Sequence, residues 1–282
     1  MSQLLADNSL IDDLCAALKL KYIIKESESL EDFLGVHMAR VNARLHLSQP
    51  GLIKKLITTA ELQDNKRSVR IPIHNDWNEG EQDKTARCEG GIFRTLLGML
   101  IFLLRTRPDI AFAVNTLATR CASATLRDLD AIHEVILYLK YTAHLELSYN
   151  PADPDQCHTV GRLYGWADAA YACHRDGKSH SGMCLSYGLP GTGKFSSTSK
   201  KQSLVCLSST EAELYAAVEA TKDIIFCRAI LAELGFHQRH PTTLNFMIKH
   251  VAHQVVHLEY LNILDHSADL CTKAFTVREA LR

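Results

Sequence analysis

The sequence lacks several features that would assign it to a class at once. Its nine cysteines are odd in number, scattered, and never spaced as Cys-x-x-Cys, which argues against a disulfide framework or a cysteine zinc site and fits a reducing compartment. The longest apolar run, residues 96–104, is far too short to span a bilayer. The start carries Asp7, Asp12 and Asp13 where a signal peptide would be basic. We therefore expect an intracellular protein, cytoplasmic or nuclear, with no membrane partner.

An excess of charge of one sign is also missing. The 282 residues include 31 Lys and Arg and 32 Asp and Glu, so the formal net charge is −1. No bulk positive field attracts nucleic acid, and any such binding must use a local patch. The length allows one or two domains, and a hydrophobic fraction of 46% is ordinary for a globular protein with a core.

A clear helix start is present in the second half of the chain. Ser209 and Thr210 are good N-cap residues, and acids follow in the first turn, where the helix dipole favours negative charge. The pattern predicts a short strand over residues 203–207 that leads into this helix. Gly235 predicts its end, because glycine readily adopts the left-handed backbone that closes a helix.

Glu213 stands out on this predicted helix. A carboxylate near a helix start is either an exposed N-terminal acid or a metal ligand, and taken alone the first interpretation is the commoner one. A second acid, Asp168, favours the interpretation of Glu213 as a metal ligand. Asp168 lies in an aromatic-rich run over residues 163–169 that is typical of a strand. The face of the helix that Glu213 occupies is otherwise small and apolar, with Ala217, Ala220 and Ile224.

The residues between the two acids predict further strands before the helix. A hairpin through Asp176 and Gly177 leads to a strand over residues 183–187, and a Gly/Pro-rich turn comes after it. Residues 188–195 resemble a phosphate-binding P-loop. However, Phe195 stands where Ser or Thr must reach Mg²⁺, and the next residues are strand-like, so a hairpin turn is the better prediction.

Four short motifs occur in the second half: Gly-Trp-Ala-Asp-Ala (165–169), Ser-Lys-Lys-Gln (199–202), Ser-Ser-Thr-Glu-Ala-Glu (208–213) and Ser-Ala-Asp-Leu-Cys-Thr-Lys (267–273). Each is weak alone, but together they are specific. They resemble the ribonuclease H domain at the end of a copia-type retrotransposon Pol polyprotein. The resemblance extends over about residues 10–275, nearly the whole chain.

This resemblance implies an α/β fold, with a ribonuclease H-like mixed sheet and flanking helices over residues 156–282. It also implies hydrolysis of RNA in RNA/DNA hybrids by two Mg²⁺ ions, one activating water and one steadying the leaving oxygen. By motif match, the catalytic and metal-ligating residues are Asp168, Glu213 and Asp269. The hybrid is the implied partner; protein partners and oligomeric state are not indicated.

The family uses four acids, and one is missing here. Residues 241–244 resemble the start of the strand that should end in it, but they run directly into a segment that lies well downstream in relatives. No Asp or Glu occurs between Glu233 and Glu259. The resemblance therefore implies a domain shortened near residues 244–245. We expect the ions to be at most weakly held, the activity to be weak or absent, and the sheet to be opened with apolar surface exposed.

The first quarter of the chain predicts a β-hairpin and a helix. Residues 32–38 and 44–49 have strand character and are joined through Asn42, and residues 52–62 have helical spacing. This is an α+β segment, in contrast to the α/β second half.

Phe-Leu-Gly-Val (33–36) with Leu-Ser-Gln (47–49) resembles the primer-grip region of copia-type reverse transcriptases. The resemblance implies a palm-edge and thumb remnant over residues 1–75 from which the polymerase active site is absent. Lys54 and Lys55 would then face the backbone of a duplex; a solvated basic helix turn is the alternative.

A linker and helical connection are expected over residues 76–155. Gly, Pro and polar residues over 69–91 predict a long loop. Helices are predicted from Arg94, after Pro108, and over residues 126–142.

Two further groups of residues, one of lysines with an arginine and one of histidines, each have two possible interpretations. A basic rim beside Asp168 could hold the phosphates of the hybrid, or the same charges could simply keep the surface soluble. Its members are Lys194, Lys200, Lys201, Arg175 and Lys178. His250, His253 and His257 suggest a metal cluster, but positions four apart on a strand lie roughly 13 Å apart.

Whether the chain is an enzyme is therefore open at this point. The alternatives to a weak ribonuclease H-type endonuclease are a non-catalytic nucleic-acid-binding remnant and a non-functional transposon-derived reading frame.

Overall fold

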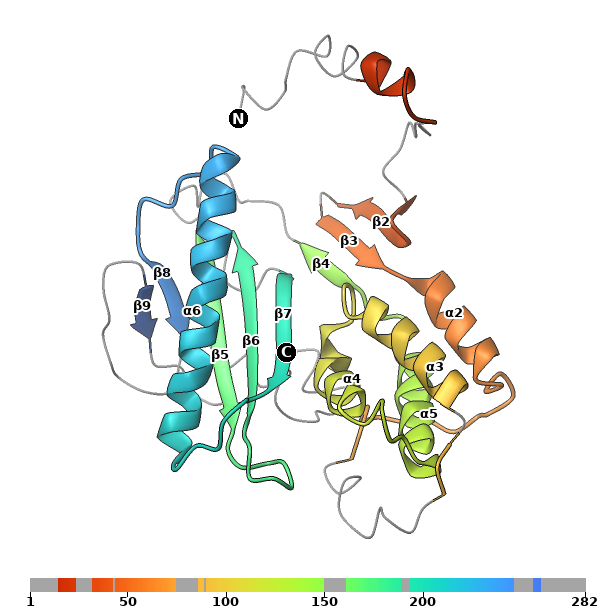
Figure 1. Ribbon diagram of the computed structural model, residues 1–282. Coiled ribbons are helices and arrows are strands. Elements are labelled where there is room, and N and C mark those ends of the chain that lie inside the picture. Colours follow the sequence, from red (N-terminus) through yellow and green to blue (C-terminus); the bar gives the residue numbers. More distant parts are fainter. Residues whose placement is uncertain are drawn as a thin grey trace.

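The computed structural model describes residues 15–23, 32–42, 44–74, 86–88, 90–149, 161–188, 193–245 and 256–259, the last four by their backbone alone. Within these ranges the chain forms two sheets and a group of packed helices (Figure 1). This mixture confirms the expected α/β class in general terms. Among the described residues, no helix has both the length and the apolar character needed to cross a membrane.

The first sheet is antiparallel, with strands in the order β1-β2-β3-β4. The hairpin predicted through Asn42 is confirmed, and this residue adopts a left-handed backbone with φ 49°. Sequence patterns missed β4, because three residues are too few to show an alternation and its partner β3 lies about a hundred residues earlier. The strands are β1 (Asp32–Phe33), β2 (Val36–Val41), β3 (Arg44–Ser48) and β4 (Leu147–Tyr149).

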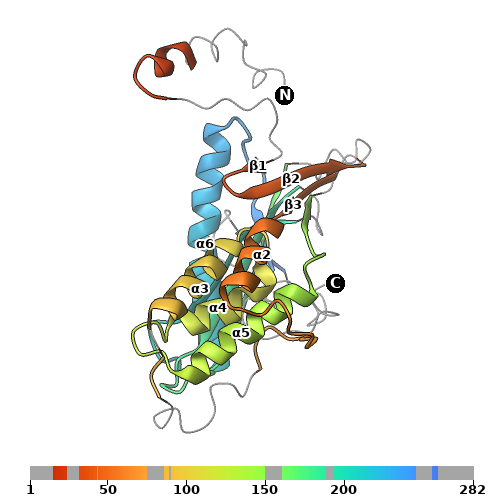
Figure 2. The same cartoon turned by 90° about the vertical axis from the view of Figure 1, so that its right-hand side faces the viewer.

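Four helices bury their apolar faces in one core (Figure 2). They are α2 (Pro50–Thr59), α3 (Gly90–Leu103), α4 (Ala111–Ala118, preceded by the 3₁₀ turn Pro108–Ile110) and α5 (Leu126–Tyr141). The start of α5 is fixed by a capping box, in which Thr125 and Asp128 exchange side chain–backbone hydrogen bonds. Lys140 ties the end of α5 to the segment that follows α2, since its ammonium donates to the carbonyls of Leu62, Gln63 and Asn65.

The second sheet has the order β7-β6-β5-β8-β9, with β5, β6 and β7 antiparallel and with β8 and β9 parallel to β5. Its strands are β5 (Leu163–Ala170), β6 (His180–Tyr187), β7 (Lys194–Lys201), β8 (Thr242–Asn245) and β9 (Val256–Glu259). The long helix α6 (Ser209–Glu233) covers one face (Figure 1). The predicted strand over 163–169, the hairpin at Gly177 and the helix end at Gly235 are confirmed.

The predicted strand over residues 203–207 is wrong. The third strand is β7, which is rich in Ser and Lys, and the chain leaves the sheet at Gln202. The side-chain amide of Gln202 donates to Ser181 Oγ and to the carbonyl of Ala212, so it directs the chain from β7 into α6. Val205 and Leu207, which suggested a strand, are exposed. The N-cap of α6 is Ser208, one residue before the expected cap.

The expected opening of the sheet is not found in the described part, because β8 is paired on both sides, with β5 and with β9. Exposed apolar surface is found instead on α6. Leu214, Val218 and Ile225 lie along one flank of the helix, and each is about half exposed. Their spacing of four and seven residues forms a continuous stripe on the helix surface.

Candidate functional site

Asp168 lies near the end of β5 and is almost fully buried, with 4% of its surface exposed. Strand alternation places its side chain on the same face as Trp166 and on the face opposite α6. The neighbouring Ala167 and Ala169 pack against α6, which fixes this orientation. Asp168 is paired across the sheet with Gly182 of β6.

Glu213 lies in the first turns of α6 and is 8% exposed, so it is not the solvated acid that its position alone would suggest. That capping role belongs to Glu211. The hydroxyl of Ser208 accepts from the amide of Glu211, and the carboxylate of Glu211 accepts from the amide of Leu207 at 2.6 Å. The helix start therefore leaves Glu213 on the sheet-facing side.

The structure brings the two acids to the same end of the β5–α6 pair. Ala169, next to Asp168, shares a small apolar cluster with Ala212 and Ala216, which flank Glu213. Because these neighbours are alanines, helix and strand approach closely. Both carboxylates are buried, Glu213 on the sheet-facing side of α6 and Asp168 on the opposite face of β5. Oxygen ligands of this kind suit Mg²⁺.

The third acid assigned by resemblance, Asp269, lies outside the described residues, as do His250 and His253. Within the described ranges, no group of three or more His, Cys, Asp or Glu side chains is placed to hold a metal ion. At the end of β8 the chain carries Asn245, whose amide donates to the carbonyl of Gly165 at 3.3 Å. This strand end therefore supplies an amide, tied to β5, where the resemblance calls for an acid.

The five residues of the expected basic rim do not share one face. Lys194 lies on the Asp168 face with its Nζ 3.6 Å from the ring centroid of Trp166, and burial lowers the pKa of this ammonium. Lys201 also lies on that face, but its Nζ pairs with Asp176 at 2.8 Å. Lys200 points to the opposite face, toward α6. The other two residues of the set, Arg175 and Lys178, lie in the turn between β5 and β6.

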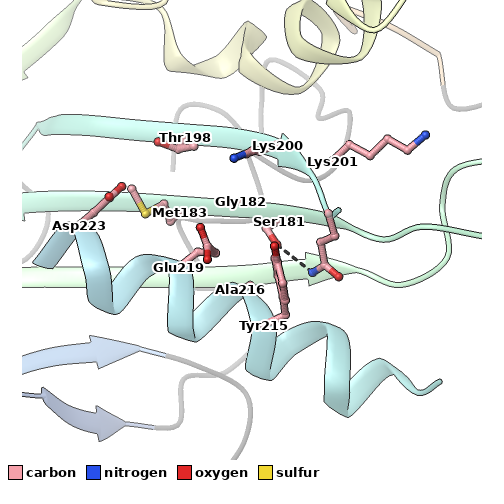
Figure 3. Close-up of a pocket in the computed structure, with 11 residues that line it drawn as sticks. Ser181, Gly182, Met183, Thr198, Lys200, Lys201, Tyr215, Ala216, Glu219 and Asp223 are labelled. Carbon is pink, nitrogen blue, oxygen red and sulfur yellow. Dashed lines mark hydrogen bonds between the residues drawn. The ribbon is translucent and has the colours of Figure 1, made fainter. Parts of the chain in front are cut away.

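The face toward α6 contains a groove of about 170 Å³ between the β6–β7 hairpin and the helix (Figure 3). Lys200 faces Glu219 and Asp223 across it, and Tyr215 lies further along the helix. Burial, and then the charge of Glu219, raise the pKa of Asp223. With carboxylates on one wall and one ammonium on the other, the groove has no excess charge suited to a phosphate backbone.

Sequence reasoning missed a buried pair of histidines on the Asp168 face of the sheet. His174 and His180 are hydrogen-bonded to each other at 3.0 Å, and His180 also contacts Ser199. A lone histidine in a turn and another in a strand carry no spacing signal, so only the fold brings them together. Residues 194–201 form a strand, as predicted against a P-loop, because a nucleotide-binding loop would lead into a helix.

In the first half, Lys54 and Lys55 are exposed on α2. An open cleft of about 490 Å³ lies beside Lys55, between the β1–β2 turn, the start of α2 and Phe102 of α3. Gly35 is required in that turn, since it has φ 75° and a Cβ there would touch the ring of Phe102. The surface is compatible with a basic helix turn beside a shallow cleft.

Comparison with known proteins gives the class. No protein-family model matches the chain. The chain is similar to the retrovirus-related Pol polyprotein from transposon RE1 of Arabidopsis thaliana, at 28% identity over 235 residues that cover 83% of this chain and 15% of the relative. It is also similar to the Pol polyprotein from transposon TNT 1-94 of Nicotiana tabacum, at 28% over 243 residues, with coverages of 83% and 18%.

A shorter relative is matched along most of its length. An uncharacterized mitochondrial protein of Arabidopsis thaliana is 28% identical over 219 residues, which are 77% of this chain and 85% of the relative. Together these matches indicate the class of retrovirus-related Pol polyproteins. Within that class, the chain is similar to the copia-like transposon polyproteins, and the matches support a fragment of a retrotransposon Pol polyprotein. It spans 15–18% of the length of three of the curated transposon polyproteins that it matches.

Proposed function

We propose that residues 156–282 form a ribonuclease H-like domain whose ancestral activity is Mg²⁺-dependent hydrolysis of RNA in RNA/DNA hybrids. The observation that carries this proposal is the sheet itself. Three antiparallel strands are followed by two strands parallel to the first, and the order places β5 at the centre. One buried acid, Asp168, lies on that central strand and another, Glu213, on the helix packed against it. A two-metal hydrolase needs several oxygen ligands around its ions, and these two acids are the candidates in the described residues.

The two buried carboxylates fit Mg²⁺ by their chemistry, because hard oxygen ligands are what this ion prefers. In the proposal, Asp168 and Glu213 hold the metal and Asp269 completes the set. When bound, the metal supplies an activated water and charge stabilisation at the leaving oxygen. The role of the chain in this proposal is to keep the carboxylates shielded from solvent, and both are buried.

The activity is proposed to be weak or absent, and binding without cleavage is the second candidate. Asn245 carries this alternative, because its amide is committed to the carbonyl of Gly165 and cannot act as an anionic ligand. A two-metal site that lacks one of four acids should lose orders of magnitude in rate. In this proposal, residues 1–75 are a thumb remnant and residues 76–155 a connection, and both extend the surface for a hybrid.

The test is incubation of the full chain with Mg²⁺ and a labelled RNA/DNA hybrid, with Asp168→Asn as the matched control for contaminating nucleases. We expect slow or no cleavage, and hybrid binding that weakens steeply with salt. Robust cleavage that Asp168→Asn abolishes would show an intact enzyme and contradict the impairment. Neither binding nor cleavage, in a chain with a cooperative thermal transition, would leave a folded remnant without this function.

A further inference from the structure

A buried chain of hydrogen bonds crosses the face of the second sheet that is opposite α6. His174 Nε2 lies 3.0 Å from His180 Nδ1, and His180 Nε2 lies 2.7 Å from Ser199 Oγ. His180 is 1% exposed. Phe112 of α4 closes over it, with ring centroids 5.1 Å apart at an interplanar angle of 76°. One imidazole ring therefore joins the β5–β6 turn, the edge strand β7 and a helix of the other half.

This contact is where the helical core meets the second sheet. Helix α4 is anchored in that core by Ala113, Val114 and Leu117, and it lies beside β7 (Figure 1). Gly193 and Tyr149 connect the two halves again at the other end of β7, through Gly193 N–H to the carbonyl of Ser148 and Tyr149 O–H to that of Lys194. The α4 contact can therefore loosen while the chain stays joined at β4.

The charged groups around His180 come from the sheet. Lys201, its cross-strand neighbour on β7, pairs with Asp176 of the turn at 2.8 Å, and the thiol of Cys173 lies in the same turn. On β5, Asp168 lies one cross-strand pair further along. Helix α4 carries no titratable side chain. The side chains that bond to the His180 ring or stack on it are those of His174, Ser199 and Phe112, and none of them carries a negative charge. A proton on His180 would therefore be a buried positive charge next to the ammonium of Lys201.

We propose that this contact is an acid-sensitive joint, closed while His180 is neutral and opened when His180 takes up a proton. In the closed form, both ring nitrogens are satisfied and Phe112 excludes water. An imidazolium in that position loses its hydration, and neither group bonded to the ring, His174 or Ser199, is an anion. Separation of α4 from the hairpin exposes the ring and solvates the charge.

The size of the effect is set by linkage between protonation and opening. Burial, then the charges of His174 and Lys201, lower the pKa of His180 from 6.5 to about 3 in the closed form. An exposed ring has its ordinary pKa of about 6.5. The ratio of open to closed molecules is then multiplied by about 30 between pH 7.5 and pH 5. Burial also lowers the pKa of His174, which adds to the effect in the same direction.

Hydroxyl-radical footprinting of the full chain, read by peptide mass spectrometry at pH 7.5 and pH 5, measures the opening. Phe112 is the reporter, Phe226 on the exposed side of α6 normalises the dose, and Phe93, fully buried in the helical core, reports general loosening. At pH 5 we expect oxidation of Phe112 relative to Phe226 to rise at least twofold, with no change at Phe93. Equal oxidation of Phe112 at the two pH values, or a parallel rise in the oxidation of Phe93, would overturn the proposal.

Three variants tie the response to His180. His180→Gln keeps a donor and an acceptor but cannot titrate, so its Phe112 oxidation should not depend on pH. His144→Gln removes an exposed histidine and should leave the response intact. If His180→Gln does not fold, Lys201→Met serves instead, because loss of the neighbouring ammonium should move the opening to lower pH. A response that survives in His180→Gln, or that does not shift in Lys201→Met, contradicts the proposal.

Discussion

Arg107 and Asp109 form a two-pronged ion pair inside the helical half, with Nε–Oδ1 and Nη2–Oδ2 distances of 2.9 and 2.7 Å. The guanidinium is 3% exposed. It also donates to the carbonyl of Thr142 at the end of α5, and the hydroxyl of Tyr138 donates to Asp109 at 2.8 Å. Burial, then the charge of Asp109, raise the pKa of Tyr138, so the phenol remains a donor. The network joins the turn before α4 to α5.

Breaking this pair from one side should be costly. Arg107→Met leaves the Asp109 carboxylate buried without its cation, and we expect a loss of about 3–5 kcal/mol in the free energy of unfolding. Urea denaturation measures the change. Arg105→Met is the matched control, since Arg105 is exposed and lies over Phe102, and it should cost less than about 1 kcal/mol. A loss below about 1 kcal/mol for Arg107→Met would contradict a structural role.

The close approach of α6 to β5 depends on Gly165. A Cβ at this position would lie 3.0 Å from Ile224 and 3.1 Å from Leu244, both fully buried. Gly165→Ala should therefore destabilise the second sheet by about 1–3 kcal/mol. Gly98→Ala in α3 meets no atom within 4 Å and should stabilise by about 0.4–1 kcal/mol. Thermal melts of both variants test these two expectations. Equal changes in Tm for Gly165→Ala and Gly98→Ala would disprove the crowding at Gly165.

Magnesium should stabilise the chain only slightly. If the ions bind with a dissociation constant near the concentration added, the gain is about 0.4 kcal/mol, or roughly 1–2 °C in Tm. Differential scanning calorimetry with and without about 10 mM MgCl₂ measures it, and Asp168→Asn should show no shift. A rise above about 8 °C that Asp168→Asn removes would reveal a tightly held metal.

Stability should fall as the pH is lowered from 7 toward 5. In the unfolded chain His180 takes up a proton below pH 6.5, whereas in the folded chain its pKa of about 3 keeps it neutral, so acid favours unfolding. At pH 5 the loss from this residue is about 2 kcal/mol. Urea titrations at several pH values should show this slope in the wild type and a flatter one in His180→Gln. Identical slopes would locate the acid sensitivity elsewhere.

Much of the fold could be predicted from local patterns. The Asn42 hairpin, the β5 strand and the end of α6 at Gly235 each depend on a few adjacent residues with strong preferences. The strand at 203–207 was mispredicted because Val205 and Leu207 alternate like a strand, whereas the choice is made by Gln202 through contacts with distant residues.

The site was predictable to a different extent. Asp168 and Glu213 could be chosen by motif, and the structure buries both near the same end of β5 and α6. Strand alternation, however, points Asp168 to the face opposite α6, which the motifs could not show. The division of the lysines between two faces is a consequence of strand alternation, but it required the exact bounds and register of β7. The histidine pair could not be predicted from a sequence pattern, because His174 and His180 are brought together only by the turn between β5 and β6.

The apolar stripe of Leu214, Val218 and Ile225 has a practical consequence for production of this chain. An exposed apolar stripe of this kind favours aggregation and chaperone binding during expression. Detergent-free yield and monodispersity should therefore improve when these three side chains are exchanged for glutamine or lysine, and such a triple variant is the sensible starting material for biochemical assays.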